Sequence, residues 1–302
     1  MRRMKKYFFP LLSSLILCSG LAMAGQEIAV VQSIRVGPYE EAFEGLNSVC
    51  KDGIHRLVIS GMNRSDVMEG IRKIAPDVIL AIGMEALKTA KDIKDNIPIV
   101  YLMVLDGEAV RSAGGNITGV SMNISQEKQL AAILKALPET KTIGLLYDPE
   151  MTGQYAKEAL EACRQSNIRL ISKEIHNPRD VPSALSSMKG NIDVFWLLPD
   201  LTVVTPETVE ILLLFSLENQ IPVITFSEKY VELGALMSIG IDAFDIGVQA
   251  GEMAQEILAG RNVKVIPHAD ARSAVVAINI KIAKKLGINI PEDVIARAKK
   301  IE

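Results

Sequence analysis

The sequence contains few of the residues from which metal centres and many catalytic sites are built. Among 302 residues there are three histidines and three cysteines. His55, His176 and His268 lie far apart and lack the spacing of metal ligands. Cys50 and Cys163, the two cysteines beyond the first 24 residues, are too widely separated for a disulfide framework or a metal motif. We therefore expect no metal ion, no cofactor and no scaffold of disulfide bonds.

Motifs for nucleophilic catalysis and nucleotide binding are missing as well. The nearest approach to a G-x-S-x-G elbow, residues 119–123, fails at its last position. Neither a P-loop nor a G-x-G-x-x-G turn occurs. The sequence thus assigns no catalytic residue, and we expect a protein that is not an enzyme.

Long apolar runs are absent beyond the N-terminus, where residues 1–24 have the pattern of a secretory signal peptide. A basic start precedes an apolar segment over residues 7–21, and small residues follow at Ala22 and Ala24. The apolar segment is too short to span a bilayer comfortably. We expect cleavage after Ala24 and a periplasmic protein, with an uncleaved N-terminal anchor as the alternative.

Removal of the signal peptide makes the chain more acidic. Lys plus Arg falls from 33 to 29 while Asp plus Glu stays at 36, so the net charge changes from −3 to about −7. Nucleic-acid binding needs a basic footprint, so we expect no nucleic-acid partner. A hydrophobic content of 49% allows a large core, in one large domain or two medium ones.

Apolar, β-branched runs alternate with helical patterns along the remaining chain. Runs that are apolar almost throughout favour strands buried on both faces, as in a parallel sheet. The expected strands cover residues 28–31, 56–59, 78–82, 99–104, 143–147, 170–175, 194–198 and 223–226. Among the intervening helices, residues 152–167 place Ala156, Leu160 and Cys163 on one face. Cys50 ends a similar stripe, so both cysteines are expected to face the core.

The order of these elements occurs twice. Asp77 precedes a strand that is followed by a helix and then by Pro98 at the start of another strand. Asp193 and Pro222 stand in the same relation in the second half of the chain. Two similar halves predict an α/β protein with two Rossmann-like lobes, and residues 114–121 are an expected crossing between them.

Residues that follow the expected strands are the candidates for ligand contact, because ligands of open α/β sheets bind beyond the carboxyl ends of the strands. The candidates are Gln32, Ser33, Gly83, Met84, Glu85, Asp106, Tyr147, Asp148, Gln154, Tyr155, Asp200, Thr202, Phe226, Ser227 and Asp242.

Three kinds of contact are expected within this set. The acidic candidates for an ammonium group are Asp148, Asp200 and Asp242. Helix starts near residues 84–86 and 151–154 offer backbone N–H groups to a carboxylate. The rings expected to line the site are those of Tyr147, Tyr155 and Phe226. For each Asp the alternative is a local role as a helix cap or turn residue.

Several segments resemble the substrate-binding proteins of ABC transporters, in the subgroup typified by tryptophan- and tyrosine-binding members. The longer segments are GGNITGVS at 114–121, ALMSIGID at 235–242 and INIKIAKKLGINIP at 278–291. Leu198-Pro199-Asp200 and Tyr147-Asp148-Pro149 also match positions at the cleft of that family. The resemblance covers nearly all of the chain beyond the signal peptide.

The resemblance implies a type I periplasmic binding protein, in which two Rossmann-like lobes are joined by a hinge with three crossovers. Lobe 1 is expected to comprise residues 25–120 and about 242–269, and lobe 2 residues 121–241 and about 270–302. A small molecule, expected to be an amino acid or a related compound, binds between the lobes. The implied partner is an ABC transporter permease with its ATPase, and the protein is expected to be a monomer.

The chain departs from the family pattern at positions that line the expected cleft. Glu85 lies in a loop where the family often has a hydroxyl residue, and Gly107 follows Asp106 where Pro is common. Ile239 and Ile241 replace a frequent Tyr and Pro. These departures predict a ligand different from, or more cationic than, an aromatic amino acid, with Glu85 as the selecting group.

Two other functions stay open at this point. The same lobes would serve equally as the ligand-binding subunit of a sensory or receptor system. An exported α/β hydrolase is the further alternative, and the missing nucleophile–base pair argues against it.

Overall fold

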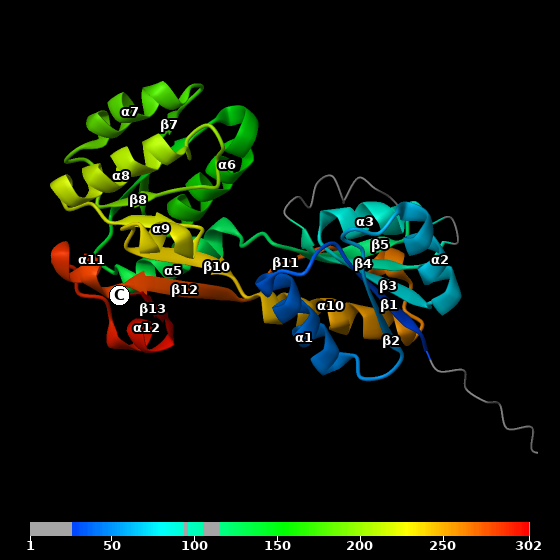
Figure 1. The fold of residues 1–302 in the computed structure, drawn as a ribbon. Coiled ribbons are helices and arrows are strands. Elements are labelled where there is room, and N and C mark those ends of the chain that lie inside the picture. The colour runs from blue at the N-terminus through cyan, green and yellow to red at the C-terminus, as the bar shows by residue number, and fades with distance from the viewer. Residues whose placement is uncertain (1–25, 94–95, 105–114, 302) are drawn as a thin grey trace, which may run out of the picture.

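The protein consists of two open α/β sheets, each covered by helices, in a computed structural model that describes residues 26–93, 96–104 and 115–301 (Figure 1). We call the six-stranded sheet with its helices lobe 1 and the seven-stranded sheet with its helices lobe 2. The lobes lie beside each other and are joined by extended chain segments (Figure 1). The expected signal peptide and Asp106 lie outside the described residues.

Lobe 1 combines the N-terminal part of the chain with a segment that returns much later. Its strands are β1 (Ile28–Gln32), β2 (Ile54–Val58), β3 (Val78–Ile82), β4 (Ile99–Val104), β5 (Ile117–Ser121) and β11 (Ala269–Asp270). Its helices are α1 (Gly37–Val49), α2 (Arg64–Ile74), α3 (Met84–Lys91), α10 (Ala243–Leu258) and the 3-10 turn η2 (Val263–Val265). The order β11-β5-β4-β3-β1-β2 is parallel throughout.

Lobe 2 contains the middle of the chain and its C-terminus. Its strands are β6 (Thr142–Tyr147), β7 (Arg169–Glu174), β8 (Val194–Trp196), β9 (Val223–Thr225), β10 (Met237–Ile241), β12 (Ala274–Asn279) and β13 (Lys299–Ile301). Its helices are α5 (Gln126–Ala136), α6 (Pro149–Gln165), η1 (Pro178–Asp180), α7 (Val181–Met188), α8 (Pro206–Asn219), α9 (Glu228–Glu232), α11 (Ile280–Lys285) and α12 (Glu292–Arg297). In the order β13-β12-β10-β9-β8-β6-β7, β10 and β12 are antiparallel and the other pairs are parallel.

The two sheets share one topology. Without the added strands β11, β12 and β13, lobe 1 has the order β2-β1-β3-β4-β5 and lobe 2 the order β7-β6-β8-β9-β10. The repeated aspartates also have the same role. Asp77 accepts the N–H of Glu27 just before β1, and Asp193 accepts those of Lys141 and Thr142 at the start of β6. The expected α/β fold with two Rossmann-like lobes is confirmed.

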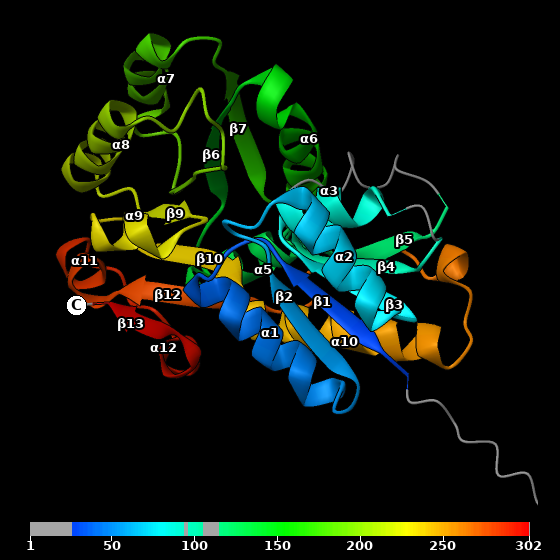
Figure 2. The same cartoon turned by 45° about the vertical axis from the view of Figure 1, so that its right-hand side comes forward.

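Strand residues alternate between two apolar layers in each lobe. In lobe 1, Ile28 and Val30 pack in the core that contains α1 and α10, whereas Ala29 and Val31 pack with α2 and α3. Figure 2 shows these helix pairs on opposite faces of the sheet. In lobe 2, α5 and α6 cover one face and α7 and α8 the other. Two-sided burial explains why the central strands are apolar without alternation.

Two of the strands expected to be buried on both faces are edge strands instead. β2 and β7 each pair with a single neighbour, and their residues are largely half-buried or exposed. The helix expected at 152–167 begins earlier, because Asp148 caps it and Pro149 fits its first turn. Leu160 is 52% exposed, so its placement in the core was wrong.

Cys50 and Cys163 are free thiols and both are buried, as expected. Burial raises the pKa of Cys163 to about 11 and also raises that of Cys50. Both side chains therefore remain protonated near neutral pH and behave as small apolar groups.

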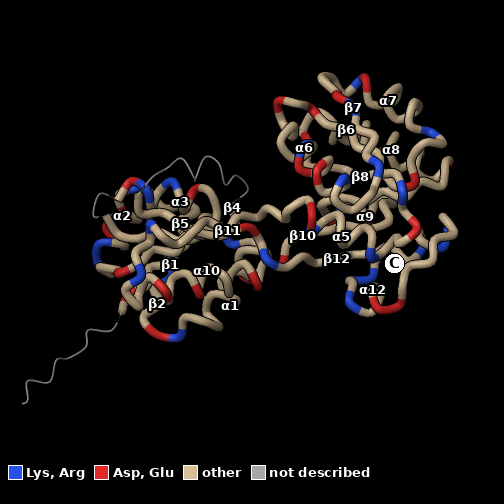
Figure 3. The backbone as a smooth tube through the Cα atoms, turned by 180° about the vertical axis from the view of Figure 1, so that it is seen from behind, with Lys and Arg blue, Asp and Glu red and all other residues tan. Residues whose placement is uncertain are grey.

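In the described part of the chain, three crossovers join the lobes. Residues 122–125 connect β5 to α5, residue 242 connects β10 to α10, and residues 271–273 connect β11 to β12. Ser121 and Asp270 still pair within the sheet of lobe 1. Seen from behind, acidic and basic residues are interspersed along both lobes (Figure 3).

Candidate ligand-binding site

The carboxyl ends of the parallel strands of both lobes lie toward the crossovers. The chain leaves lobe 1 from the carboxyl end of β5 and leaves lobe 2 from the carboxyl end of β10, and the neighbouring strands run parallel to these two. In sheets of this order, ligands bind where the strand order reverses, between the first and third strands. The candidate site therefore lies between β1 and β3 in lobe 1 and between β6 and β8 in lobe 2.

Ser33, Tyr39 and Gly83 meet at the place in lobe 1 where the strand order reverses. We call this place, between the first and third strands of a lobe, its switch point. Gly83 has a φ of +89°, and a Cβ there would lie 2.7 Å from the Tyr39 hydroxyl and 2.8 Å from Ser33 Oγ. Glycine is therefore required by both its conformation and its surroundings. Ser33 Oγ donates to the carbonyl of Ile82 (3.0 Å) and accepts the N–H of Ala86 (2.9 Å), which fixes the start of α3 beside β1. Burial raises the pKa of the half-buried Tyr39, so its hydroxyl remains a neutral donor.

The first turn of α3 presents backbone donors to the same region. The N–H groups of Met84 and Glu85 make no hydrogen bond within the described ranges. Free N–H groups at a helix start favour an anionic group. The Glu85 side chain is 69% exposed and pairs with Lys88 at 2.8 Å. The expectation that Glu85 selects a cationic ligand gains no support from this position.

Gln32 is buried, and its amide is committed to neighbouring protein groups. Its Nε2 donates to the carbonyl of Ile34 (2.6 Å) and to Glu40 (2.9 Å), and its Oε1 accepts from Arg56 (2.6 Å). The Arg56 guanidinium also lies 4.0 Å from the centre of the Phe43 ring. Gln32 therefore supports the chain after β1, and the expectation that it contacts a ligand gains no support from these hydrogen bonds.

The substitution Glu40→Gln should destabilise the protein at pH 7 more than at pH 3. Hydrogen bonds from Gln32 and Arg56, together with the positive charge of Arg56, lower the pKa of Glu40. Its contribution to stability is complete above the unfolded-state pKa of about 4.3 and is lost as pH falls through the lower folded-state pKa. Urea unfolding of wild type and variant at both pH values measures the effect. A difference that does not change with pH would contradict this prediction.

Asp200 is fully buried and accepts four hydrogen bonds within lobe 2. Its Oδ2 accepts from the Asp148 N–H at 2.7 Å and from the Thr152 hydroxyl. Its Oδ1 accepts from the N–H groups of Thr202 (2.9 Å) and Val203 (3.0 Å). A carboxylate that is closed to solvent and occupied by four donors ties the loop after β8 to the start of α6, so the expected ligand contact of Asp200 gains no support from these contacts.

Asp148 and Thr202 lie at the lobe 2 switch point that Asp200 holds together. Asp148 Oδ1 accepts the N–H of Glu150 at 3.0 Å, and its Oδ2 accepts the Thr202 hydroxyl at 2.7 Å. These two hydrogen bonds, the one from Thr202 foremost, lower the pKa of Asp148. Asp148 is therefore both a helix cap and an ionised group at the carboxyl end of β6.

Aromatic rings follow the lobe 2 strands. Phe226 and Tyr230 form an edge-to-face pair with ring centroids 5.4 Å apart, directly after β9. Tyr155 is half-buried on α6. Tyr147 donates its hydroxyl to Glu174 at 3.1 Å, so this end of the ring is engaged within lobe 2. The ring faces can still line a site while the polar tips are satisfied elsewhere.

Of the three other candidates, Gln154 and Asp242 have local roles. Gln154 is exposed and bonds Glu158 along the surface of α6 (2.9 Å). Ser227 precedes α9 without a side-chain cap bond. Asp242 accepts the N–H of Asp245 at 3.0 Å and caps α10 within the second crossover.

No group of three or more His, Cys, Asp or Glu in the described part of the chain is arranged to hold a metal ion. His55 pairs with Glu27 at 2.5 Å, His176 is exposed, and His268 stacks on Tyr101. Over the same ranges, no helix has the length and apolar character needed to cross a bilayer.

Comparison with known proteins decides the family. Residues 27–302 match the family described as ABC transporter substrate binding protein. The chain belongs to this family. The resemblance drawn from the three sequence segments is confirmed, and the two-lobed substrate-binding protein has the fold of type I periplasmic binding proteins. Membership implies a small-molecule ligand and an ABC transporter as partner.

Relatives of this substrate-binding protein include a tyrosine-binding protein of Clostridioides difficile (strain R20291). It is 31% identical over 218 residues, which cover 70% of this chain and 63% of the relative, less than two thirds of its length. Among solved structures, the ligand-free, open form of a substrate-binding protein with adhesive properties from Clostridium difficile superposes with a TM-score of 0.74. That match has 24% identity and covers 92% of this chain and 99% of the other.

A further solved structure, a domain from Streptococcus pneumonia in complex with L-Trp, has a TM-score of 0.57. It is 23% identical and is matched over 92% of this chain and 100% of its own. Both solved structures share the fold of the substrate-binding protein.

Reasoning from strand ends missed Tyr39 and Tyr230. Each lies in the helix that follows a candidate segment, α1 after Ser33 and α9 after Ser227. The available signal was an aromatic residue in the first turn of a helix that starts beside a strand end, since such a turn faces the same edge of the sheet.

Proposed function

We propose that the protein is an extracytoplasmic solute-binding protein that captures an amino acid or a related compound between its lobes and delivers it to an ABC importer. It is exported, loses residues 1–24 and acts as a monomer in the periplasm. Lobe 1 comprises residues 25–121 and about 242–270, and lobe 2 residues 122–241 and about 271–302, one residue past the expected bounds because β5 and β11 belong to the sheet of lobe 1.

One observation carries the proposal: groups suited to the two ends of a zwitterion stand at the two switch points. In lobe 1, free N–H groups at the start of α3 lie beside the Ser33 and Tyr39 hydroxyls. In lobe 2, the ionised Asp148 stands beside Thr202. Backbone donors suit a carboxylate, and an aspartate suits an ammonium group.

The side chain of the amino acid packs against the rings of lobe 2. Tyr155, Phe226 and Tyr230 supply apolar faces that follow β6 and β9. The names of two similar proteins, which mention tyrosine and L-Trp, support an aromatic amino acid as the first ligand to test. A ligand that contacts both lobes favours their closed arrangement, because it binds that arrangement more tightly.

We expect L-tyrosine or L-tryptophan to raise the melting temperature of the purified chain that begins at Gly25. A ligand at about 100 times its Kd stabilises the native state by about 2.7 kcal/mol. Tyramine, which lacks the carboxylate, and 3-(4-hydroxyphenyl)propionate, which lacks the amine, should have little effect. The proposed ligand class is wrong if a full panel of amino acids leaves the melting temperature unchanged.

The variant Tyr39→Phe should bind the identified amino acid about three- to tenfold more weakly, the loss expected for one hydrogen bond of about 0.5–1.5 kcal/mol. Its own melting temperature should barely change, because the Tyr39 hydroxyl has no hydrogen-bond partner in the part of the chain that the structure describes. Tyr230→Phe is the matched control, since it keeps the ring that packs on Phe226. Calorimetry of wild type and both variants provides the comparison.

A further inference from the structure

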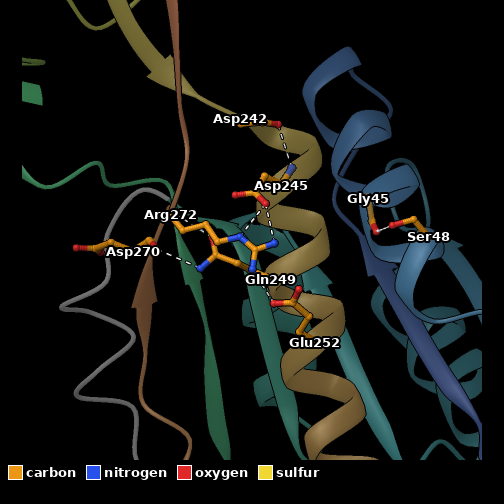
Figure 4. A network of polar contacts seen from close by, with 8 residues as sticks. All are labelled: Gly45, Ser48, Asp242, Asp245, Gln249, Glu252, Asp270 and Arg272. Atoms are coloured by element: carbon orange, nitrogen blue, oxygen red, sulfur yellow. Dashed lines mark hydrogen bonds and ion pairs between the residues drawn. The ribbon is translucent and has the colours of Figure 1, made fainter. Parts of the chain in front are cut away.

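The third crossover is fastened to lobe 1 by a charged side chain. Arg272 reaches α10, where its Nε and Nη2 bond Asp245 Oδ1 at 2.8 and 2.7 Å. Its Nη1 bonds Glu252 at 2.8 Å, two helical turns further along (Figure 4). One guanidinium therefore holds two carboxylates on the same face of α10, in the planar geometry that arginine favours.

The backbone of this crossover is fixed to lobe 1 as well. The N–H of Arg272 donates to Gln249 Oε1 at 2.9 Å, and Gln249 Nε2 donates to the carbonyl of Asp270 at 3.4 Å (Figure 4). The Asp270 carboxylate accepts from Ser121 Oγ (2.6 Å) and Asn123 Nδ2 (3.2 Å). Side chains and backbone thus join the first and third crossovers to each other and to α10.

The attachment to lobe 2 begins immediately afterwards. Ala274 is the first residue of β12 and pairs with Ile241 in the sheet of lobe 2. Ser273 alone separates this pairing from the contacts of Arg272 with α10. From lobe 2, the Lys128 side chain also reaches back to the carbonyl of Ala271 at 3.0 Å. A long, flexible lysine side chain can follow a rotation of lobe 2. The guanidinium of Arg272 is less free, because it is bound to both Asp245 and Glu252.

We propose that Arg272 is a positioning residue that makes residues 269–272 move with lobe 1, so that the lobes rotate about Ser273 in this crossover. The inference rests on the proposed function, since the rotation is the closure of the lobes around a ligand. Arg272 touches no ligand. It restricts the range of lobe orientations and thereby reduces the ordering that closure requires.

The charges of Asp245 and Glu252 explain why the attachment of the third crossover to α10 depends on arginine. Asp245 is 17% exposed and Glu252 49% exposed. Burial raises the pKa of Asp245, but hydrogen bonds from Arg272 and Ser273 and the charge of Arg272 outweigh it, so the pKa is lowered. Without Arg272, Glu252 loses its contact with the crossover, and Asp245 keeps only its hydrogen bond from the Ser273 side chain.

Spin labels on the two lobes test the proposal in the full mature chain without a ligand. Cys50 and Cys163 are buried, so labels attach at introduced cysteines, Lys73→Cys in lobe 1 and Lys157→Cys in lobe 2, both at exposed positions. We expect Arg272→Ala to broaden the interlobe distance distribution and Arg272→Lys to restore part of its width.

Arg261→Ala is the matched control, because Arg261 also forms an ion pair with a residue of α10, Glu256, but far from the crossover. It should leave the distribution unchanged. A distribution for Arg272→Ala as narrow as that of wild type would overturn the proposal. Broadening by Arg261→Ala as large as that by Arg272→Ala would also overturn it, because the effect would then be general to α10.

Binding of L-tyrosine or L-tryptophan gives the second measurement. Arg272→Ala should weaken binding about three- to tenfold at an almost unchanged melting temperature, and Arg272→Lys should recover part of the loss. If wild type binds no amino acid, the proposed function fails, while the ligand-free distance distributions still decide the role of Arg272. If wild type binds and Arg272→Ala binds equally well, the positioning role is wrong and the proposed function stands.

Discussion

Asp200→Ala should lower the free energy of unfolding by about 3–5 kcal/mol. The carboxylate is fully buried and satisfies donors on Asp148, Thr152, Thr202 and Val203. Each hydrogen bond to a charged group contributes about 1.5–3 kcal/mol, and a buried donor left unpaired costs about 1–3 kcal/mol. Rearrangement and water entry reduce the sum, which is why we expect less than four full bonds. Urea unfolding of the purified variant measures the loss.

Asp193→Ala is the matched control for this experiment. Asp193 also accepts two backbone N–H groups at the start of a strand, but it is exposed. Water replaces its hydrogen bonds, so we expect a loss of only about 1 kcal/mol. If Asp200→Ala costs no more than Asp193→Ala, the role assigned to Asp200 is wrong, and its carboxylate again becomes a candidate for the ligand.

Gly247→Ala should destabilise the protein by about 2–3 kcal/mol. α1 and α10 cross so closely that a Cβ at Gly247 would lie 1.9 Å from the carbonyl oxygen of Ala42 and 2.9 Å from the backbone nitrogen of Leu46. Both obstacles are backbone atoms, so the helices must move apart. Overpacking typically costs about 1–3 kcal/mol or more, and the helix propensity of alanine offsets at most about 1 kcal/mol.

Two other glycines provide a graded comparison. At Gly251 the nearest atom to an added Cβ is Val49 Cβ at 3.1 Å, so Gly251→Ala should cost much less than Gly247→Ala. At Gly153 in α6 the nearest atom is 3.9 Å away, and Gly153→Ala should stabilise by about 0.5–1 kcal/mol. Urea unfolding of the three variants gives the ranking. Stabilisation by Gly247→Ala would show that the two helices are less closely packed than described.

The central strands β1, β3 and β4 could be predicted from sequence, because they are buried on both faces and almost all of their residues are apolar. The edge strands β2 and β7 could not be recognised as edges in the same way. Whether a strand has one neighbour or two depends on the order of strands in the sheet, which is a tertiary property. The repeated aspartates gave indirect information on this order. Asp77 joins the start of β3 to the start of β1, and Asp193 joins the start of β8 to the start of β6.

The candidate site was predicted only in part. Ser33 and Gly83 follow from the rule that ligands bind beyond strand ends, and the structure brings them together. Asp200 satisfies the same rule, but the sequence does not reveal that its oxygens are already occupied by four donors. The sequence likewise does not reveal that the amide of Gln32 is occupied by Ile34, Glu40 and Arg56. Tyr39 was missed because its contribution depends on how α1 lies against the end of β3.

The packing of α1 against α10 has a consequence for the order in which the chain is completed. α10 follows every strand from β6 to β10, so a chain emerging from its N-terminus has an unfinished lobe 1 until residues 243–258 are available. By then the five-stranded centre of lobe 2 has been synthesised in full. Contacts between segments so distant in sequence form slowly. The discontinuity of lobe 1 thus delays compaction of this lobe in the nascent polypeptide until α10 has been synthesised.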